Sequence, residues 1–280
     1  MKWLLNLLLL GVLSGCASSP AADSPLAAPA GRIIDLRSGQ ALSAEQLLSQ
    51  AAGAERLIVG EKHDNRQHHL IEQWLVEQLP QIRPQGSVLL EMLTPSQQAQ
   101  VDKVKAWLQT GPSARPSRVA ELVAWQPGWP WPQYGDLAMT LLRAPYPLWA
   151  ANLDRDEMRE AYRLRPALQG VESARPEVAS RLIDLIRQEH GGELRDDVLR
   201  SMLAVQQQRD RRMAQRLLAA PAPALLIAGA YHAMADMGVP LHVRDLAPQA
   251  RPLVLILAED GARIDSRHAD LVWYTAAARP

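Results

Sequence analysis

The stretch Leu57-Ile-Val-Gly-Glu-Lys-His-Asp-Asn-Arg-Gln-His-His69 decides how this chain is expected to fold. Its apolar run ends at Gly60, and polar or ionisable residues follow from Glu61 to Arg66. This order predicts a buried strand that runs into a polar loop, with an amphipathic helix after the loop. Ligands of open parallel sheets bind at the carboxyl ends of the strands, so the loop is a candidate for ligand or metal chemistry.

Apolar runs alternate with helical patterns along the rest of the chain. Strands are expected at residues 32–35 (an edge strand), 57–59, 87–92, 148–152, 224–228, 253–257 and 269–275. Helices are expected at residues 44–52, 67–79 (ended by Pro80), 95–108 and 136–143, with a loop at 110–118 and irregular, proline-rich chain at 124–134. Strands that alternate with helices predict an α/β fold, a parallel sheet with flanking helices.

The block from 155 to 219 has a helical pattern throughout and no strand signal, which predicts a small all-helical subdomain. The expected organisation is therefore a signal peptide at 1–15, a flexible tether at 16–30, a parallel-sheet α/β domain formed by 31–154 and 220–280, and the helical subdomain at 155–219. The tether is rich in Ala, Ser and Pro, as flexible linkers are.

The first residues have the pattern of a lipoprotein signal. Lys2 supplies a positive charge, an apolar run from Leu4 to Val12 follows, and Leu13-Ser-Gly-Cys16 has the small residues of a lipobox before the only cysteine. We expect cleavage before Cys16 and acylation of that residue, with palmitate among the chains. Ala17 is not acidic, which favours the outer membrane over inner-membrane retention in a Gram-negative host.

Composition excludes several classes of function. The net charge is zero and no long basic run exists, so nucleic-acid binding has no electrostatic basis. Once Cys16 is acylated, no cysteine remains for a disulfide or a thiolate metal site. A metal or haem would have to be held by His, Tyr, Met or carboxylate groups.

Polar residues follow four of the expected strands: Glu61 and His63, Glu91, Asn152, and Tyr231 with His232. Parallel strands bring such residues to one edge of the sheet. Two acids and two histidines there could bind a divalent metal or carry out acid–base chemistry. The other interpretation is unrelated loop polarity, and for Asn152 a cap on the following helix is favoured.

Three further features have two interpretations each. His68 and His69 are adjacent on a helix, so we expect one to face the site and the other to face solvent or Trp74. The Trp- and Pro-rich stretch at 124–134 either fills core space under a loop or forms a flat apolar wall for a planar ligand. The arginines at 206–216 are expected on a solvated helix face, and contact with a ligand's propionates is the alternative.

Five motifs together resemble the ChaN family of iron-regulated, haem-binding bacterial lipoproteins. They are Gly-Glu-Lys-His-Asp-Asn at 60–65 with the later His-His, Leu-Glu-Met at 90–92, Ala-Ala-Asn at 150–152, Ala-Gly-Ala-Tyr-His at 228–232 with Gly-Val-Pro at 238–240, and Ala-Asp-Leu-Val-Trp-Tyr-Thr at 269–275. The resemblance extends from about residue 31 to 276. The family belongs to a superfamily with the TIKI metalloproteases, TraB and the erythromycin-esterase-like proteins.

The resemblance implies a haem-binding homodimer in which a tyrosine of one subunit holds each ferric haem iron and a histidine of the other meets the propionates. Tyr134 ranks first as the iron ligand because it follows the Trp/Pro stretch, and Tyr231 ranks second. Tyr274 is expected in the core. The histidine is open among four candidates: His63, His68, His69 and His232.

We therefore expect a non-catalytic, haem-binding outer-membrane lipoprotein in haem or iron acquisition, acting beside an uptake receptor. The alternative is a metal-dependent hydrolase of the related superfamily, with Glu61, His63, Glu91 and His232 as metal ligands or as base and acid.

Overall fold

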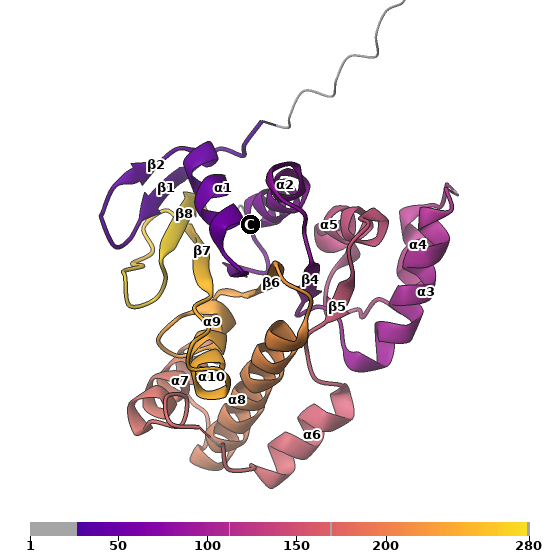
Figure 1. Cartoon of the computed structure of the whole chain (residues 1–280). Helices are drawn as coiled ribbons and strands as arrows, with labels where there is room; N and C mark the ends of the chain where they lie inside the picture. Colours follow the sequence, from indigo (N-terminus) through magenta and orange to yellow (C-terminus); the bar gives the residue numbers. More distant parts are fainter. Residues whose placement is uncertain (1–26, 112, 169, 279–280) are drawn as a thin grey trace, which may run out of the picture.

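The structure is a computed structural model that describes residues 27–111, 113–168 and 170–278. Within these residues, eight strands form one sheet in the order β2-β1-β8-β7-β3-β6-β4-β5 (Figure 1). The strands are β1 Arg32–Asp35, β2 Ala41–Leu42, β3 Arg56–Glu61, β4 Ser87–Leu90, β5 Leu148–Ala150, β6 Ala224–Gly229, β7 Leu253–Glu259 and β8 Leu271–Thr275. The α/β prediction is confirmed.

Six strands, from β8 to β5 in spatial order, are parallel, whereas β1 and β2 are antiparallel additions at one edge. The expected sheet was parallel, with residues 32–35 at its edge. Instead β1 lies second from the edge, because only residues 36–40 separate it from β2. So short a link permits a hairpin and excludes the crossover that a parallel pair requires.

Alternating side chains of the strands face two separate hydrophobic clusters. Leu57 and Val59 contribute to one cluster, whereas Ile58 between them contributes to the other. The first cluster packs under α1 Ala44–Gly53, α2 Arg66–Ile82, α3 Gln98–Gln109, α4 Pro116–Leu122 and α5 Trp131–Arg143. A sheet covered on both faces buries its strands completely, which explains why they are apolar runs rather than alternating patterns.

The second face is covered by the helical block and the helices after β6. These are α6 Arg155–Leu164, α7 Pro176–Glu189, α8 Asp196–Ala219, α9 Ala230–Ala233 and α10 Val239–Leu246. Figure 1 shows α6, α7 and α8 gathered at one end of the molecule, beside α9 and α10. Leu182 and Met213 share a hydrophobic cluster with Ile58 and Leu226 of the sheet, so α7 and α8 pack onto the sheet core. The subdomain boundaries stay a prediction.

Helix α2 continues through Pro80 to Ile82, although Pro80 was expected to end it. Proline has no N–H and therefore leaves the carbonyl four residues earlier without its helical donor. That carbonyl belongs to Val76, and it accepts a hydrogen bond of 3.3 Å from the Tyr146 hydroxyl. A side chain 70 positions away thus replaces the missing donor, and no local pattern could show this.

Three local boundaries also differ from expectation. Pro95–Gln97 forms a 3-10 turn before α3, and α4 begins at Pro116, inside the expected loop. The Trp/Pro stretch is irregular only as far as Pro130, since α5 begins at Trp131 with Pro132 in its first turn. Proline is tolerated there because first-turn N–H groups have no helical acceptor.

The expected signal peptide and most of the tether, with Cys16, lie outside the described residues. In the described part of the chain, no helix has both the length and the apolar character needed to cross a bilayer.

Gly60 is a position in β3 where only glycine fits. An added Cβ would lie 2.5 Å from the Cβ of Ala233 and 2.7 Å from Cδ1 of Ile256. We expect Gly60→Ala to lower the free energy of unfolding by about 1–3 kcal/mol, since α9 and β7 would have to move. Urea denaturation measures the change. The control is Gly53→Ala, where no atom lies within 4 Å of the added methyl and no loss of stability is expected. Equal stability of both variants would contradict the close approach.

Candidate functional site

The carboxyl edge of the parallel sheet gathers the polar residues that follow the strands. Glu61 is the last residue of β3, Glu91 follows β4, and Asn152 lies two residues beyond β5. Gly229 ends β6, and His232 lies in the short helix α9 directly after it. All of these except the glycine are polar and almost completely buried.

Glu61 is the centre of the first polar group. Its Oε1 lies 2.6 Å from Nδ1 of His63 and accepts a hydrogen bond of 2.8 Å from the Tyr134 hydroxyl. Its Oε2 lies 3.0 Å from Nε2 of His69. Trp129 packs edge-on against His63 with ring centroids 4.9 Å apart. Trp129 of the Trp/Pro stretch therefore packs on this group, and the stretch also lines a cavity of about 270 Å³ through Trp125, Trp129 and Trp131.

Protonation within this group is set by burial and by Glu61. Burial raises the pKa of the Glu61 carboxyl, but its bonds to His63 and His69 outweigh burial and leave the pKa below its ordinary value. Burial and the adjacent Glu61 charge together raise the pKa of Tyr134 far above its ordinary value. Tyr134 is therefore a neutral, buried hydrogen-bond donor.

Glu91 is the centre of a second group. Its Oε2 accepts a hydrogen bond of 2.7 Å from the backbone N–H of Gly229, and its Oε1 forms a salt bridge with Arg209. Nε2 of His232 lies 3.5 Å from the same Oε1. Burial alone would raise the pKa of Glu91, but the charges of His232 and Arg209 and the Gly229 bond lower it to about 2. Glu91 is therefore ionised at neutral pH.

The two groups meet beside Gly229. A Cβ on Gly229 would lie 2.8 Å from Nε2 of His63 and 3.6 Å from Oε2 of Glu91. The structure thus brings together the four residues Glu61, His63, Glu91 and His232. Because Gly229 has no side chain, His63 and Glu91 can both lie against its backbone.

Helix α8 supplies partners that the sequence analysis missed. Asp210 Oδ1 lies 2.5 Å from Nδ1 of His232, and the Gln206 amide lies 3.0 Å from the same nitrogen. Arg209 also donates from Nε to Asn152 Oδ1 at 3.0 Å. The expectation that this arginine-rich stretch is solvated was wrong for Arg209, because α8 crosses the sheet edge. It was also wrong for Arg212, which pairs with Glu157, and for Arg216, which donates to the Ala150 carbonyl. The one sign in the sequence of the contacts at the cluster was the adjacent pair Arg209-Asp210. The acid of this pair faces His232, which follows another strand.

Asn152 does not cap a helix, contrary to expectation. Its side-chain amide donates to the backbone oxygen of Glu91 at 2.9 Å, and Asp154 is the residue that caps α6. The adjacent histidines also differ from expectation, since both are buried. His69 faces Glu61, whereas His68 accepts a bond of 2.9 Å from the Lys62 N–H. Burial lowers the pKa of His68 to about 4, so it is neutral.

The two carboxylates at the centres of the polar cluster are fully bonded within the protein, whereas the buried Oδ2 of Asp210 and Nδ1 of His69 have no hydrogen-bond partner in the described residues. Both oxygens of Glu61 and both oxygens of Glu91 already contact protein N–H, O–H or ring nitrogen atoms. In the part of the chain that the structure describes, no group of three or more His, Cys, Asp or Glu side chains is arranged to hold a metal ion.

A cavity of about 560 Å³ lies next to the cluster, between α6, α7 and α8. Its apolar lining is Met158, Tyr162, Leu182, Leu185, Ile186, Met202 and Val205. Its charged and polar lining is Arg155, Arg159, Glu189, His190, Gln206 and Arg209, and Tyr231 completes the wall. Arg209 and Gln206 also contact the polar cluster, so the cluster and the cavity share a wall.

The two candidate tyrosines have opposite environments. Tyr231 is 39 % exposed, and its hydroxyl donates to Glu189 at 2.9 Å beside the cavity. Burial and the bond to Glu189 raise the pKa of Tyr231 to about 12. Tyr134 is 1 % exposed and does not line this cavity. A bound planar ligand therefore has access to the oxygen of Tyr231 but not to that of Tyr134.

A family model described as haem-binding uptake, Tiki superfamily, ChaN matches residues 47–243. This segment spans most of the chain and contains both the polar cluster and the cavity. The chain belongs to this ChaN family. The expectation drawn from the five motifs is therefore confirmed at the level of the family.

The ChaN-like fold is also seen in solved structures. One is a protein of Campylobacter jejuni whose structure is described as cofacial heme binding to ChaN. It is 27% identical to this chain with a TM-score of 0.80, and the alignment covers 87% of this chain and 96% of that one. A mutant of the erythromycin esterase EreC in its open conformation has a TM-score of 0.46 and 12% identity, with 82% and 76% covered. The second likeness is too weak to bear on function. A search of curated protein sequences finds no match.

The lowered pKa of Glu91 makes its contribution to stability depend on pH. Because the folded pKa of about 2 lies below the ordinary 4.5, the stabilisation is complete above pH 4.5 and is lost as pH falls toward 2. Glu91→Gln leaves Arg209 without its anion, whereas His232 keeps Asp210. It should lower the free energy of unfolding by roughly 3 kcal/mol at pH 7.

Urea denaturation between pH 7 and pH 3 tests this expectation. The difference between wild type and Glu91→Gln should narrow below pH 4.5. The control is Glu121→Gln, which removes an exposed carboxylate paired with Arg118 and should change stability by less than about 0.5 kcal/mol. A constant difference across the whole pH range would contradict the assignment of the ionised state.

Proposed function

We propose that this protein binds haem in the cavity between α6, α7 and α8 and takes part in haem or iron acquisition. Its membership of the ChaN family and its likeness to a haem-bound ChaN structure support the ligand. The observation that carries the proposal is the half-exposed Tyr231 side chain at the wall of a largely apolar cavity. Cavities of several hundred Å³ with apolar walls and a few polar groups are typical of cofactor sites.

The residues of the cavity fit the chemical groups of haem. Apolar side chains such as Leu182, Ile186 and Val205 suit the faces of a porphyrin. The guanidinium groups of Arg155 and Arg159 suit carboxylates such as propionates, because their N–H pairs match carboxylate oxygens. When bound, haem would supply an iron that accepts an anionic oxygen ligand, as in proteins with tyrosine-ligated haem.

Tyr231, rather than Tyr134, is the proposed iron ligand, which reverses the order expected from the sequence. The Tyr134 hydroxyl is buried and donates to Glu61 at 2.8 Å, so ligation would break the centre of the polar cluster. The Tyr231 hydroxyl reaches the cavity, and Glu189 beside it is positioned to accept its proton. A phenolate is a hard anionic donor, which suits the ferric state.

The structure also reduces the number of candidates for the histidine that meets the propionates. His68, His69 and His232 are buried and have ring nitrogens bonded within the protein. The side chain of His63 is 44% exposed, so it stays a candidate. We add His190, which lines the cavity and was not considered from the sequence.

A homodimer formed on haem binding is part of the proposal. Large apolar side chains are exposed around the cavity, among them Tyr162 and Tyr231, with Leu164 close by in the chain. A second copy that covered them would remove this surface from water. The location proposed is the outer membrane, through acylated Cys16, beside a haem-uptake receptor. The lipobox at residues 13–16 supports the anchor.

The alternative of a metal-dependent hydrolase is not favoured. The carboxylate oxygens of Glu61 and Glu91 are all bonded to other groups of the protein, and His232 lies between Asp210 and Glu91. The described residues contain no group of three or more His, Cys, Asp or Glu side chains arranged to hold a metal ion.

Haem binding can be tested by conservative substitution of the two tyrosines. Tyr231→Phe keeps the ring and removes only the oxygen, so ferric haem added to it should lose the tyrosinate charge-transfer absorption and bind at least tenfold more weakly. Tyr134→Phe is the matched control: it should keep the haem spectrum and instead lose about 1–3 kcal/mol of stability, because Glu61 loses a donor. The reverse pattern would restore Tyr134 as the ligand, and no uptake of haem by wild type would refute the proposal.

Anchoring can be tested at Cys16. Cys16→Ser removes the acylation site, so the chain should leave the outer-membrane fraction or accumulate with its signal peptide uncleaved. Fractionation of cells and mass measurement of the product check this. A control substitution in the proposed tether, Ser18→Ala, should leave fractionation unchanged. Normal outer-membrane recovery of Cys16→Ser would contradict the lipoprotein assignment.

A further inference from the structure

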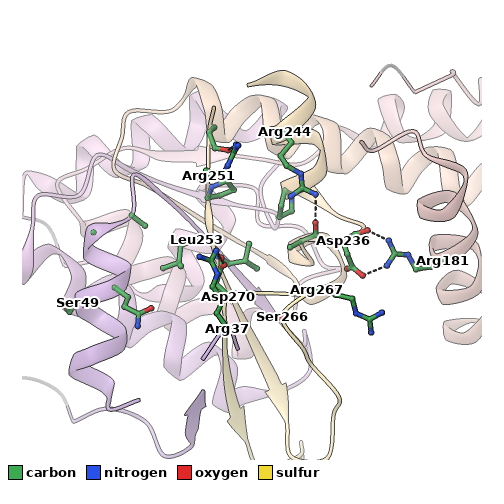
Figure 2. A pocket seen from close by; sticks show the side chains of 18 of the residues that line it. Arg37, Ser49, Arg181, Asp236, Arg244, Arg251, Leu253, Ser266, Arg267 and Asp270 are labelled. Carbon is green, nitrogen blue, oxygen red and sulfur yellow. Dashed lines mark hydrogen bonds and ion pairs between the residues drawn. The ribbon is translucent and has the colours of Figure 1, made fainter. Parts of the chain in front are cut away.

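A second cavity, of about 780 Å³, lies at the opposite edge of the sheet from the polar cluster. It is formed where β7 and β8 begin, between the end of α1, the start of α7 and helix α10 (Figure 2). Six arginines line it: Arg37, Arg175, Arg181, Arg244, Arg251 and Arg267. Only two acids line it, Asp236 and Asp270. This cavity takes no part in the haem proposal.

Four of the six arginines are neutralised by acids. Arg37 pairs with Asp270, and Arg181 pairs with Asp236. Arg175 lies 3.1 Å from Glu172, and Arg267 lies 2.8 Å from Asp265. Two of these four pairs use the acids of the lining, Asp236 and Asp270. The other two use Glu172 and Asp265, which do not line the cavity.

Arg244 and Arg251 are the two arginines of the lining that have no acidic partner within hydrogen-bond distance in the described residues. Arg244 donates from Nη2 to the backbone oxygen of Ala235 at 3.1 Å. Arg251 donates from Nη1 to the backbone oxygens of Pro248 and Ala250. Neither forms an ion pair within the described residues, and their other N–H groups remain available. Burial lowers the pKa of Arg244; the nearby charges of Glu172 and Asp245 oppose this shift, whereas those of Arg175 and Arg251 add to it.

We propose that this cavity binds a small molecule carrying a phosphate monoester, with Arg244 and Arg251 as the residues that hold the phosphate. A monoester places two negative charges on one group near neutral pH, which matches two unpaired cations close together. Guanidinium groups offer parallel N–H bonds to phosphate oxygens. The cavity is far larger than one phosphate, and Ser49, Gln50 and Pro240 line the space for the esterified part.

Asp236, whose side chain is partly buried, suggests what the esterified part of the ligand carries. Its Oδ2 is paired with Arg181, whereas its Oδ1 is buried and accepts no hydrogen bond within the described residues. A hydroxyl group on the ligand would satisfy that oxygen. The ligand class is therefore a phosphorylated, hydroxylated molecule, either soluble or the headgroup of a lipid.

Isothermal titration calorimetry of the full chain in detergent tests the site. The soluble probe is glycerol 3-phosphate, and the lipid probe is short-chain phosphatidic acid, with short-chain phosphatidylcholine as its uncharged counterpart. Binding of glycerol 3-phosphate identifies a soluble ligand. Binding of phosphatidic acid alone identifies a lipid headgroup. Both outcomes support the site only if they depend on Arg244 and Arg251, and binding of none of the probes overturns the proposal.

The dependence on arginine is tested with Arg244→Ala/Arg251→Ala, which should weaken binding at least tenfold. The charge-matched control is Arg66→Ala/Arg118→Ala, which removes two exposed cations from α2 and α4 and should change affinity less than twofold. If the double variant is less stable than wild type, Arg251→Ala alone replaces it in the binding test. This single change should keep the fold, because Arg251 bonds only to exposed backbone oxygens. Affinity should also fall between pH 7 and pH 5, as the phosphate gains a proton. Equal loss in both double variants would overturn the proposal by showing only a general charge effect.

Discussion

Burial of two carboxylates, Glu61 and Glu91, at the ends of β3 and β4 is the constraint on which the rest of this structure depends. An ionised carboxylate without partners is very unfavourable away from water, so each must be surrounded by donors. The donors come from elements far apart in the sequence: α2 and α5 for Glu61, and α8 and the end of β6 for Glu91. The two acids thereby fix how the helices on both faces of the sheet meet its carboxyl edge.

This constraint also determines where a ligand can bind. The oxygens of Glu61 and Glu91 are all bonded within the protein, and Trp129 packs against His63 on one side of the cluster. The open space lies one layer further out, where α8 presents one side of Arg209 to Glu91 and the other to the cavity with Tyr231. The cluster therefore supports the wall of the proposed haem cavity rather than forming the site itself. The arginine-lined cavity at the opposite edge is independent of both.

Much of the candidate site could be predicted from the sequence, but the role of each residue could not. Glu61, His63, Glu91 and His232 each follow an apolar run, and the register of parallel strands brings such residues to one edge. Which tyrosine is accessible depends on helix packing: Tyr134 lies on the inner side of α5, and Tyr231 lies on the outer side of α9. A difference between 1 % and 39 % exposure has no counterpart in the local pattern of either motif. Arg209 and Asp210 likewise resembled solvated residues of a charged helix.

The sequence by itself determined the order of the parallel strands and of most helices along the chain, the carboxyl-edge location of the polar residues and the family to which the chain belongs. These features follow from local periodicity and from motifs of a few residues, which act over short distances along the chain. Only the tertiary structure decided that α2 passes through Pro80, that the two carboxylates of the cluster are fully bonded, and that a cavity opens beside Tyr231. Each of these depends on a contact between residues tens of positions apart, such as Tyr146 with Val76 or Arg209 with Glu91. The energies that decide them arise from desolvation and hydrogen bonding between packed elements, and no stretch of sequence contains both partners.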